Sequence, residues 1–250
     1  MQRPAAQVPL DVALLTIAAH GDPDLDVEAE RRTLDGFASR CEPPTLDGLL
    51  RLLFRDEGFD GNREHYYDPR NSYLHEVVRR RTGIPITLSA LTLEVGRRCG
   101  VPLSAVNLPG HFLLRDKVDR TVFVDPFHRG AVLDIDGVER LYAAMRPASP
   151  FDESLLDEPD HHDILRRVLA NLHGIFLQNR DAASLAWVLE LRAALPGSTS
   201  DEHRELARVH AARGDYLAAI RTLETALERT TGEAATAIHD DLRRIAAKLN

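Results

Sequence analysis

The 250-residue chain has few cysteines and no long hydrophobic run. Its two cysteines, Cys41 and Cys99, are too few for a disulfide framework or for a structural zinc site, which needs four ligands. An apolar stretch near the start, residues 8–19, contains Asp11 and is too short to cross a bilayer. It also lacks the basic region of a signal peptide. We therefore expect a cytoplasmic protein that does not bind a membrane.

The chain also lacks an excess of basic residues. It has 31 Lys and Arg against 39 Asp and Glu, which gives a formal net charge of −8. A nucleic-acid binder usually concentrates cations on one face, so we expect no nucleic-acid partner. With 44% hydrophobic and 28% charged residues, the composition is that of a globular protein of one large or two modest domains.

The first hundred residues are predicted to be mainly helical. A polar stretch, residues 56–71, interrupts the apolar pattern and predicts a long surface loop. Pro43 and Pro44 mark the start of the helix near residues 46–53, which comes before this loop. Gly100 is placed to cap the C-terminal end of the helix near residues 86–99. Apolar residues at helical spacing predict five helices, near residues 10–17, 27–37, 46–53, 72–81 and 86–99.

The pattern then changes to short strands. A helix near 136–145 and a stretch rich in proline and acidic residues (147–160) follow them. Helices followed by a compact sheet make an α+β domain. Apolar and β-branched runs between turn residues predict antiparallel strands at 103–107, 112–115, 121–125 and 131–133.

The last part of the chain is predicted to be all helical and internally repeated. A shift of 34 residues aligns Asp181 with Asp215 and places Arg180 where the second copy has Gly214. The second copy resembles the tetratricopeptide (TPR) consensus. We expect TPR-like repeats that end in a helix at 234–249, with a generic helical bundle as the alternative.

A predicted hairpin brings His111 and Asp125 together. Symmetric pairing about the turn at residues 116–120 sets Leu113 opposite Phe123 and His111 opposite Asp125. Directly opposed residues have Cβ atoms ~4.5–5.5 Å apart, so the carboxylate would reach the imidazole and fix its tautomer. A purely structural pair is the alternative. A slip of one residue would place the two side chains on opposite faces.

Several separated motifs resemble the SirB1 family. They are the run NSYLHEVVRRRTGIPITLS at residues 71–89, then GVP at 100–102, PGHFLL at 109–114 and VDPF at 124–127. This family joins a transglutaminase-like domain to TPR-like repeats. The resemblance therefore implies an α+β transglutaminase-like (papain-like) domain over residues 1–155 and a TPR-like region over residues 156–250.

In the wider transglutaminase-like superfamily, a cysteine at a helix start precedes a histidine and an aspartate on neighbouring strands. His111 and Asp125 match the last two by motif, but the cysteine position falls near Pro85, which carries no nucleophile. A thiolate would suit that position, because a helix N-terminus lowers a cysteine pKa. Cys99 lies near the other end of the same helix, ~20 Å away. Cys41 lies outside every motif.

We therefore expect a catalytically inactive protein. The alternative is a hydrolase or acyltransferase of amide or ester bonds, in which Ser89 or Thr87 acts as the nucleophile with His111 and Asp125. Against this alternative, a hydroxyl early in a helix is commonly a cap or a packing residue.

Four residues near this pair are candidates for binding: Asn71, Thr87, Asn107 and Gly110. Asn107 and Gly110 stand just before His111 in the chain. The Asn107 amide would steady an oxyanion in an enzyme. In an inactive protein it would fix the turn through side-chain-to-backbone hydrogen bonds, and we favour this second role.

No metal and no cofactor are expected. The acidic residues between 22 and 30 are spaced like a calcium loop, but Val27 and Thr33 stand where that loop requires Gly and Glu. The partner we expect is a protein. It would bind through the helical repeats or in a cleft beside His111 and Asp125.

Overall fold

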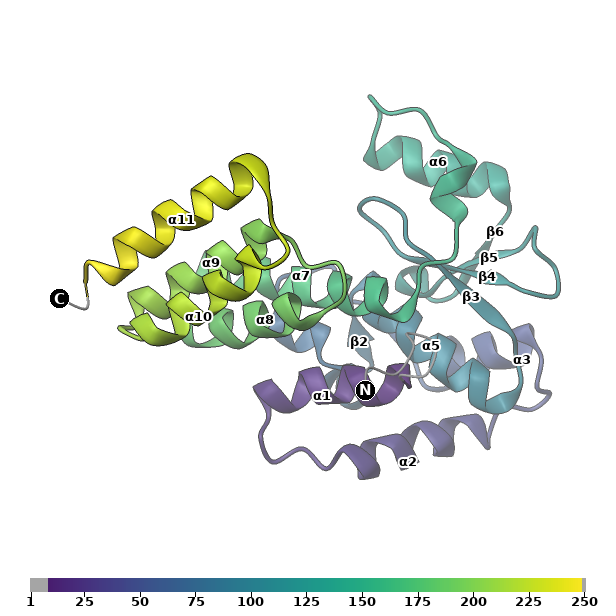
Figure 1. Ribbon diagram of the computed structural model, residues 1–250. Helices are drawn as coiled ribbons and strands as arrows, with labels where there is room; N and C mark the ends of the chain where they lie inside the picture. Colours follow the sequence, from purple (N-terminus) through teal and green to yellow (C-terminus); the bar gives the residue numbers. More distant parts are fainter. Residues whose placement is uncertain (1–8, 249–250) are drawn as a thin grey trace. The chain divides into compact units, whose positions relative to one another are not determined.

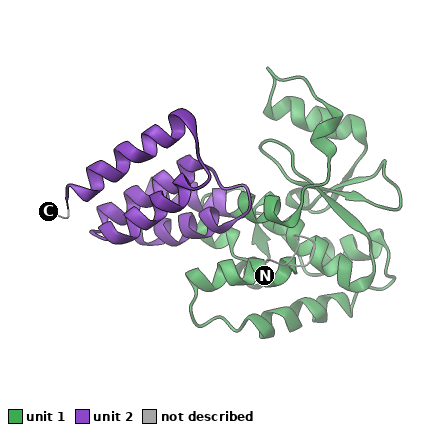
Figure 2. Cartoon of the chain, in the orientation of Figure 1, with its two compact units in different colours: residues 1–168 green, residues 169–250 purple. Residues whose placement is uncertain are grey.

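The computed structural model describes residues 9–248. The chain divides into two compact units, residues 1–168 and 169–250 (Figure 2). This division falls inside a helix and later than the predicted boundary after residue 155. The reason is that Phe151, Leu155 and Leu156, in the stretch rich in proline and acidic residues, pack against the sheet of the first unit.

The helices of the first unit follow the predicted pattern. The third predicted helix, near residues 46–53, begins as an α-helix and continues into a π-helical segment, η2 (Arg51–Asp56). The helices are α1 (Leu10–Gly21), α2 (Val27–Ala38), α3 (Leu46–Leu50), α4 (Leu74–Arg80), α5 (Pro85–Cys99), α6 (Ile135–Met145) and the start of α7 (His161–Asn179).

Helix α5 forms the centre of this unit (Figure 1). It begins at Pro85, where the missing N–H costs nothing, and ends at Gly100 in the left-handed conformation (φ +81°). Eleven of its 15 residues are buried. Helices α1 to α4 pack against it, and so do strands β3 (Leu103–Val106) and β4 (Leu113–Asp116). Every residue from Pro85 to Thr92 is buried, so the first two turns of this helix are covered on all sides.

The main sheet is antiparallel, in the order β3-β4-β5-β6, with β5 at Phe123–Asp125 and β6 at Ala131–Leu133. An apolar cluster on the sheet includes Phe123 of β5 and Val138 of α6. Helix α5 also contacts the sheet. Cover on both faces explains why all four residues of β3 are buried.

The register of the predicted hairpin is wrong by two residues. Leu114 pairs with Val124 and Arg115 with Phe123, whereas symmetric pairing placed Leu113 opposite Phe123. A shift by an even number of residues leaves every side chain on its original face. His111 and Asp125 therefore still share a face, although they are not directly opposed.

The stretch 56–71, predicted as a surface loop, is tied into the body of the unit. Its strand β1 (Asp60–Gly61) pairs in parallel with β2 (Thr82–Gly83), and a 3₁₀ turn, η3 (Pro69–Ser72), ends it. Phe59 and Asn71 are both completely buried. The predicted surface loop is thus anchored from within by these two side chains, which the polar composition of the stretch did not indicate.

The second unit holds the rest of α7 and four further helices. A core of small and apolar residues, among them Ala207, Ala219 and Leu223, joins the last three of these helices. The predicted terminal helix corresponds to α11, and residue 249 lies outside the described residues. The four helices are α8 (Ala182–Ala194), α9 (Ser200–Ala212), α10 (Tyr216–Leu227) and α11 (Gly232–Ala246).

The 34-residue shift relates two helix starts in the second unit. Asp181 and Asp215 each accept the backbone N–H three residues later, at 3.0 Å, and so cap α8 and α10. The residues before them, Arg180 (φ +57°) and Gly214 (φ +83°), both adopt the left-handed conformation. Arg180 thus takes the backbone shape of the glycine with which it aligns.

Within residues 9–248, no helix has both the length and the apolar character needed to cross a membrane.

Candidate functional site

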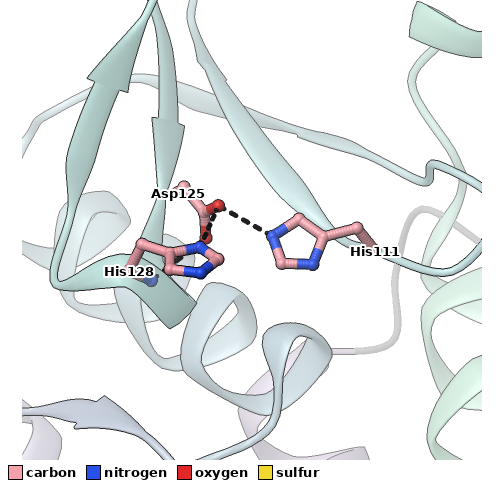
Figure 3. Close-up of side chains that lie close together, drawn as sticks. All are labelled: His111, Asp125 and His128. Carbon is pink, nitrogen blue, oxygen red and sulfur yellow. Dashed lines mark hydrogen bonds and ion pairs between the residues drawn. The ribbon is translucent and has the colours of Figure 1, made fainter. Parts of the chain in front are cut away.

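Two imidazole side chains of the first unit converge on one carboxylate oxygen (Figure 3). Asp125 Oδ2 lies 2.8 Å from His111 Nε2 and 2.7 Å from His128 Nδ1. His111 and Asp125 are buried, whereas the side chain of His128 is 46% exposed. We call these residues the His–Asp–His cluster. It contains the predicted His111–Asp125 pair and adds His128.

A tight turn positions His111 just before β4. The His111 N–H donates to the Leu108 carbonyl at 3.0 Å, and Gly110 has φ +94°. Proline followed by glycine in a left-handed conformation is typical of a type II turn. The imidazole then packs edge-on to the Phe127 ring, with centroids 5.9 Å apart. Gly110 therefore has a conformational role in presenting His111.

A 3₁₀ turn, η4 (Pro126–His128), positions the other two members. Asp125 caps this turn, and its Oδ1 accepts the backbone N–H groups of Phe127 (3.0 Å) and His128 (3.2 Å). Side chains three residues apart eclipse in a 3₁₀ helix, so His128 lies beside Asp125. The sequence DPFH contains this signal, because an Asp cap followed by Pro predicts the turn. His128 is thus a member of the site that was not among the predicted residues, although its signal is present in the sequence.

The cluster sets the charge state of Asp125. Burial alone would raise the pKa of this carboxyl, but the hydrogen bonds and charges of His111 and His128 outweigh burial and hold its pKa below the ordinary 3.8. A carboxylate only accepts hydrogen bonds, so both rings donate to it. The bond to Asp125 uses Nε2 of His111, and Nδ1 is the ring nitrogen that does not contact this carboxylate.

Neither hydroxyl candidate hydrogen-bonds to His111. Thr87 Oγ1 donates to the Asn71 carbonyl at 2.6 Å and accepts the N–H of Ile84 at 3.3 Å, which caps the start of α5. Ser89 Oγ donates to the Phe112 carbonyl at 3.3 Å. Both side chains are buried, and their protons bond to the backbone. This is the capping and packing role that competed with a nucleophilic role.

The structure also places Pro85 and the two cysteines. Pro85 occupies the first position of α5. Cys41 Sγ donates to the Pro43 carbonyl and Cys99 Sγ to the Gly96 carbonyl. Burial, together with the neighbouring Cys99 thiol, raises the pKa of Cys41 to about 12. This thiol is therefore protonated near neutral pH.

Asn71 and Asn107 differ in how their amides are used. Asn71 Nδ2 donates to the carbonyls of His65 and Tyr66, and Asn71 Oδ1 accepts from two side chains, both at 3.0 Å. All four hydrogen-bonding positions of this amide are used inside the protein. Asn107 Oδ1 is buried and has no partner within residues 9–248, so this oxygen makes no turn-fixing hydrogen bond there.

The first unit also has a cavity of about 510 Å³ over the sheet. Arg115, Phe123 and residues 153–158 contribute to its lining, and none of the candidate site residues does. This cavity is therefore not the cleft that was expected beside His111 and Asp125.

Comparison with known proteins gives a family and several relatives. The UPF0162 protein of Xylella fastidiosa (strain Temecula1) is 39% identical over 183 residues, which cover 68% of this chain and 65% of that protein. The UPF0162 protein of Vibrio cholerae is 32% identical over 141 residues, covering 56% and 52%. F-box only protein 21 of Mus musculus is 42% identical over 106 residues, covering 38% and 17%. The chain thus spans two thirds or less of each of these relatives.

No solved structure matches the chain significantly. The model of the transglutaminase-like superfamily matches residues 23–170, which include α5 and the whole His–Asp–His cluster. This match covers more than half of the sequence. The chain therefore belongs to the transglutaminase-like superfamily.

Proposed function

We propose that the protein is a catalytically inactive member of the superfamily, of the SirB1 type with TPR-like repeats, and that it acts by binding a protein partner. The observation that supports inactivity most directly is the use of the two hydroxyls. Ser89 and Thr87 donate their protons to backbone carbonyls, and neither has a hydrogen bond to the imidazole that would have to activate it.

Inactivity is tested with reagents that label an activated hydroxyl. The full chain is incubated with a fluorophosphonate and, separately, with a p-nitrophenyl ester, and adducts are located by peptide mass spectrometry. We expect no stoichiometric adduct on Ser89 or Thr87, and ester hydrolysis no faster than that of His111→Gln. Stoichiometric labelling of Ser89 that His111→Gln abolishes would replace this proposal with the hydrolase or acyltransferase alternative.

The partner surface we propose is a groove between α9 and α11 in the second unit. Its volume is about 190 Å³, and alanines 207, 211 and 212 contribute to its lining. Arg204 and Arg244 are both paired with Asp241, at 2.7 and 2.9 Å. Arg208 and Lys248 also line the groove but form no ion pair within the described residues. Four cations therefore face one carboxylate, in a chain with net charge −8.

This charge pattern supports one class of occupant, an acidic peptide segment. An arginine and a lysine without partners are suited to carboxylate side chains, and small alanines let a backbone approach closely. The 34-residue relation between α8 and α10 supports a repeat architecture, in which grooves between helices commonly hold peptides.

The groove is tested by fluorescence anisotropy with a labelled Glu-rich peptide and the same peptide with Gln at each Glu. We expect the Glu peptide to bind more tightly. Arg208→Glu and Lys248→Glu should each weaken its binding by about tenfold or more, or ~1.4 kcal/mol. Arg221→Glu makes the same charge change on α10 away from the groove and should have little effect. Equal binding of both peptides, or an equal loss with Arg221→Glu, would refute the groove.

A further inference from the structure

The His–Asp–His cluster has a geometry that catalysis through a His–Asp pair does not require. His111 Nε2, Asp125 Oδ2 and His128 Nδ1 all lie within 4.8 Å of one another. The pair alone would fix one tautomer. The second imidazole adds a third ligand-type atom on the solvent side, at the same carboxylate oxygen.

We propose that these three residues form a binding site for a divalent transition metal ion, with Zn²⁺ as the first candidate. Two imidazole nitrogens and one carboxylate oxygen are the ligands that zinc, cobalt, nickel and iron share. Calcium and magnesium prefer oxygen ligands throughout, so the donor set argues against them. Three protein ligands leave a fourth position for water or for a side chain of a bound partner.

The distances suit such an ion. Zinc lies ~2.0–2.2 Å from nitrogen and oxygen ligands, which gives ligand–ligand distances of about 3.3 Å in a tetrahedron. The two nitrogen–oxygen distances, 2.8 and 2.7 Å, are within about 0.6 Å of that value. His128 is half-exposed, so a small rotation of its ring can open the site without disturbing the core.

The groups around the ligands already hold them in place. Asp125 Oδ1 accepts two backbone N–H groups, which leaves Oδ2 to face the rings. Arg63 Nη2 donates to the Phe127 carbonyl at 2.9 Å, and the Gly130 N–H donates to the Asp125 carbonyl at the same distance. These contacts fix η4 and its two ligands. In metal sites, the ligands are typically held by such hydrogen bonds. Loss of one of the hydrogen-bonding partners lowers the metal affinity by about 10–100-fold.

The charges nearby do not prevent binding of a cation. Arg63 and Arg129 flank η4, and both are paired with Asp60, at 2.9 and 2.7 Å. A dication bound by Asp125 Oδ2 and the two rings would replace two hydrogen bonds with three coordinate bonds, once each ring has moved its proton from the ligating nitrogen to its other nitrogen.

The test is direct metal binding by the full chain, prepared without a polyhistidine tag and stripped with a chelator. Zn²⁺ binding is followed by calorimetry, and Co²⁺ binding by the visible absorption of a four- or five-coordinate ion. We expect one equivalent to bind. We expect His128→Ala to bind at least ~100-fold more weakly, because it removes a ligand. His128 is half-exposed, so this variant should fold normally, as circular dichroism will verify.

His65→Ala is the matched control, since it removes an exposed histidine of the same unit that lies outside the cluster. It should bind the metal like the unmodified chain. Failure of the unmodified chain to take up one equivalent, or equal affinity in His128→Ala, would overturn the proposal. The result is independent of the groove experiment, because the metal site and the groove share no residue.

Discussion

At the scale of single residues, Asp125 organises the site, because both of its carboxylate oxygens accept two hydrogen bonds each. It is 2% exposed, so none of these bonds is replaced by bulk water. Removing the charge of such a residue leaves the N–H groups that donate to it with a weaker acceptor. Asp125 thus connects the stability of the first unit to the geometry of its site.

We predict that Asp125→Asn lowers the free energy of unfolding at pH 7 by about 2 kcal/mol. The pKa of Asp125 is lowered in the folded state, so its carboxylate stabilises the fold above the ordinary pKa of 3.8. That stabilisation is lost as the pH falls through the folded-state pKa. The difference between the two proteins should therefore shrink as the pH falls from about 5 to 3.

Urea denaturation across this pH range measures the difference. Asp136→Asn removes an exposed carboxylate and is the control, which should change stability little at any pH. A gap between Asp125→Asn and the unmodified chain that stays constant from pH 7 to pH 3 would contradict the assigned role.

The two hydroxyls of α5 should differ in their structural importance. Thr87 makes a 2.6 Å bond to the Asn71 carbonyl and caps the helix, whereas Ser89 makes one bond of 3.3 Å. We predict that Thr87→Val destabilises the chain by about 2 kcal/mol and Ser89→Ala by less than about 1 kcal/mol. Thermal unfolding of both variants checks the order. A larger loss with Ser89→Ala would show that the cap is not the main role of this helix start.

At the scale of elements, the position of η4 depends on how closely β1 approaches it. A Cβ atom added at Gly61 would lie 2.5 Å from both the Phe127 ring and the Phe127 carbonyl oxygen. That carbonyl also accepts the hydrogen bond from Arg63. Any side chain at Gly61 must therefore displace η4, and with it two members of the His–Asp–His cluster.

We predict that Gly61→Ala destabilises the chain by about 2 kcal/mol through this overlap. Gly36→Ala is a matched control, because Gly36 lies inside α2 with nothing within 4 Å of an added Cβ. That substitution should stabilise by about 0.5–1 kcal/mol, since alanine favours helix. Chemical denaturation measures both. Equal effects of the same sign would show that β1 does not constrain η4.

The elements themselves were largely predictable, because apolar periodicity, proline starts and glycine ends are local signals. The bounds of α5 and β6 agree closely with the predicted ranges. Long-range contacts were not predictable in the same way. Asp11 interrupts an apolar run in the sequence, but it is completely buried and ion-paired with Arg98, 87 positions later. Only the fold supplies that partner.

The site was predictable as far as its local geometry reached. The motifs and the period of two brought His111 and Asp125 to one face even though the register was wrong by two residues. The use of Thr87 depended on the Asn71 carbonyl, which belongs to a segment predicted to be exposed. That contact could not be read from spacing. His128, in contrast, follows from the Asp cap and the 3₁₀ turn.

At the scale of the whole molecule, the charge distribution opposes the total charge. The chain carries −8, yet the α9–α11 groove is lined by four cations and one carboxylate. An acidic peptide is repelled by the chain as a whole and attracted at close range. Screening over ~10 Å at 0.1 M salt weakens interactions between exposed charges, and the groove cations Arg208 and Lys248 are exposed.

We therefore predict that binding of the Glu-rich peptide weakens as NaCl rises from about 50 to 500 mM, by on the order of tenfold. The contacts with Arg208 and Lys248 decide that salt weakens the binding, because these cations are much nearer to the peptide than the average acidic residue of the chain is. Anisotropy titrations at several salt concentrations give the slope. Lys248→Glu should flatten it, while Arg221→Glu should preserve it. Binding that strengthens with salt would mean that long-range repulsion dominates and that the groove cations do not hold the peptide.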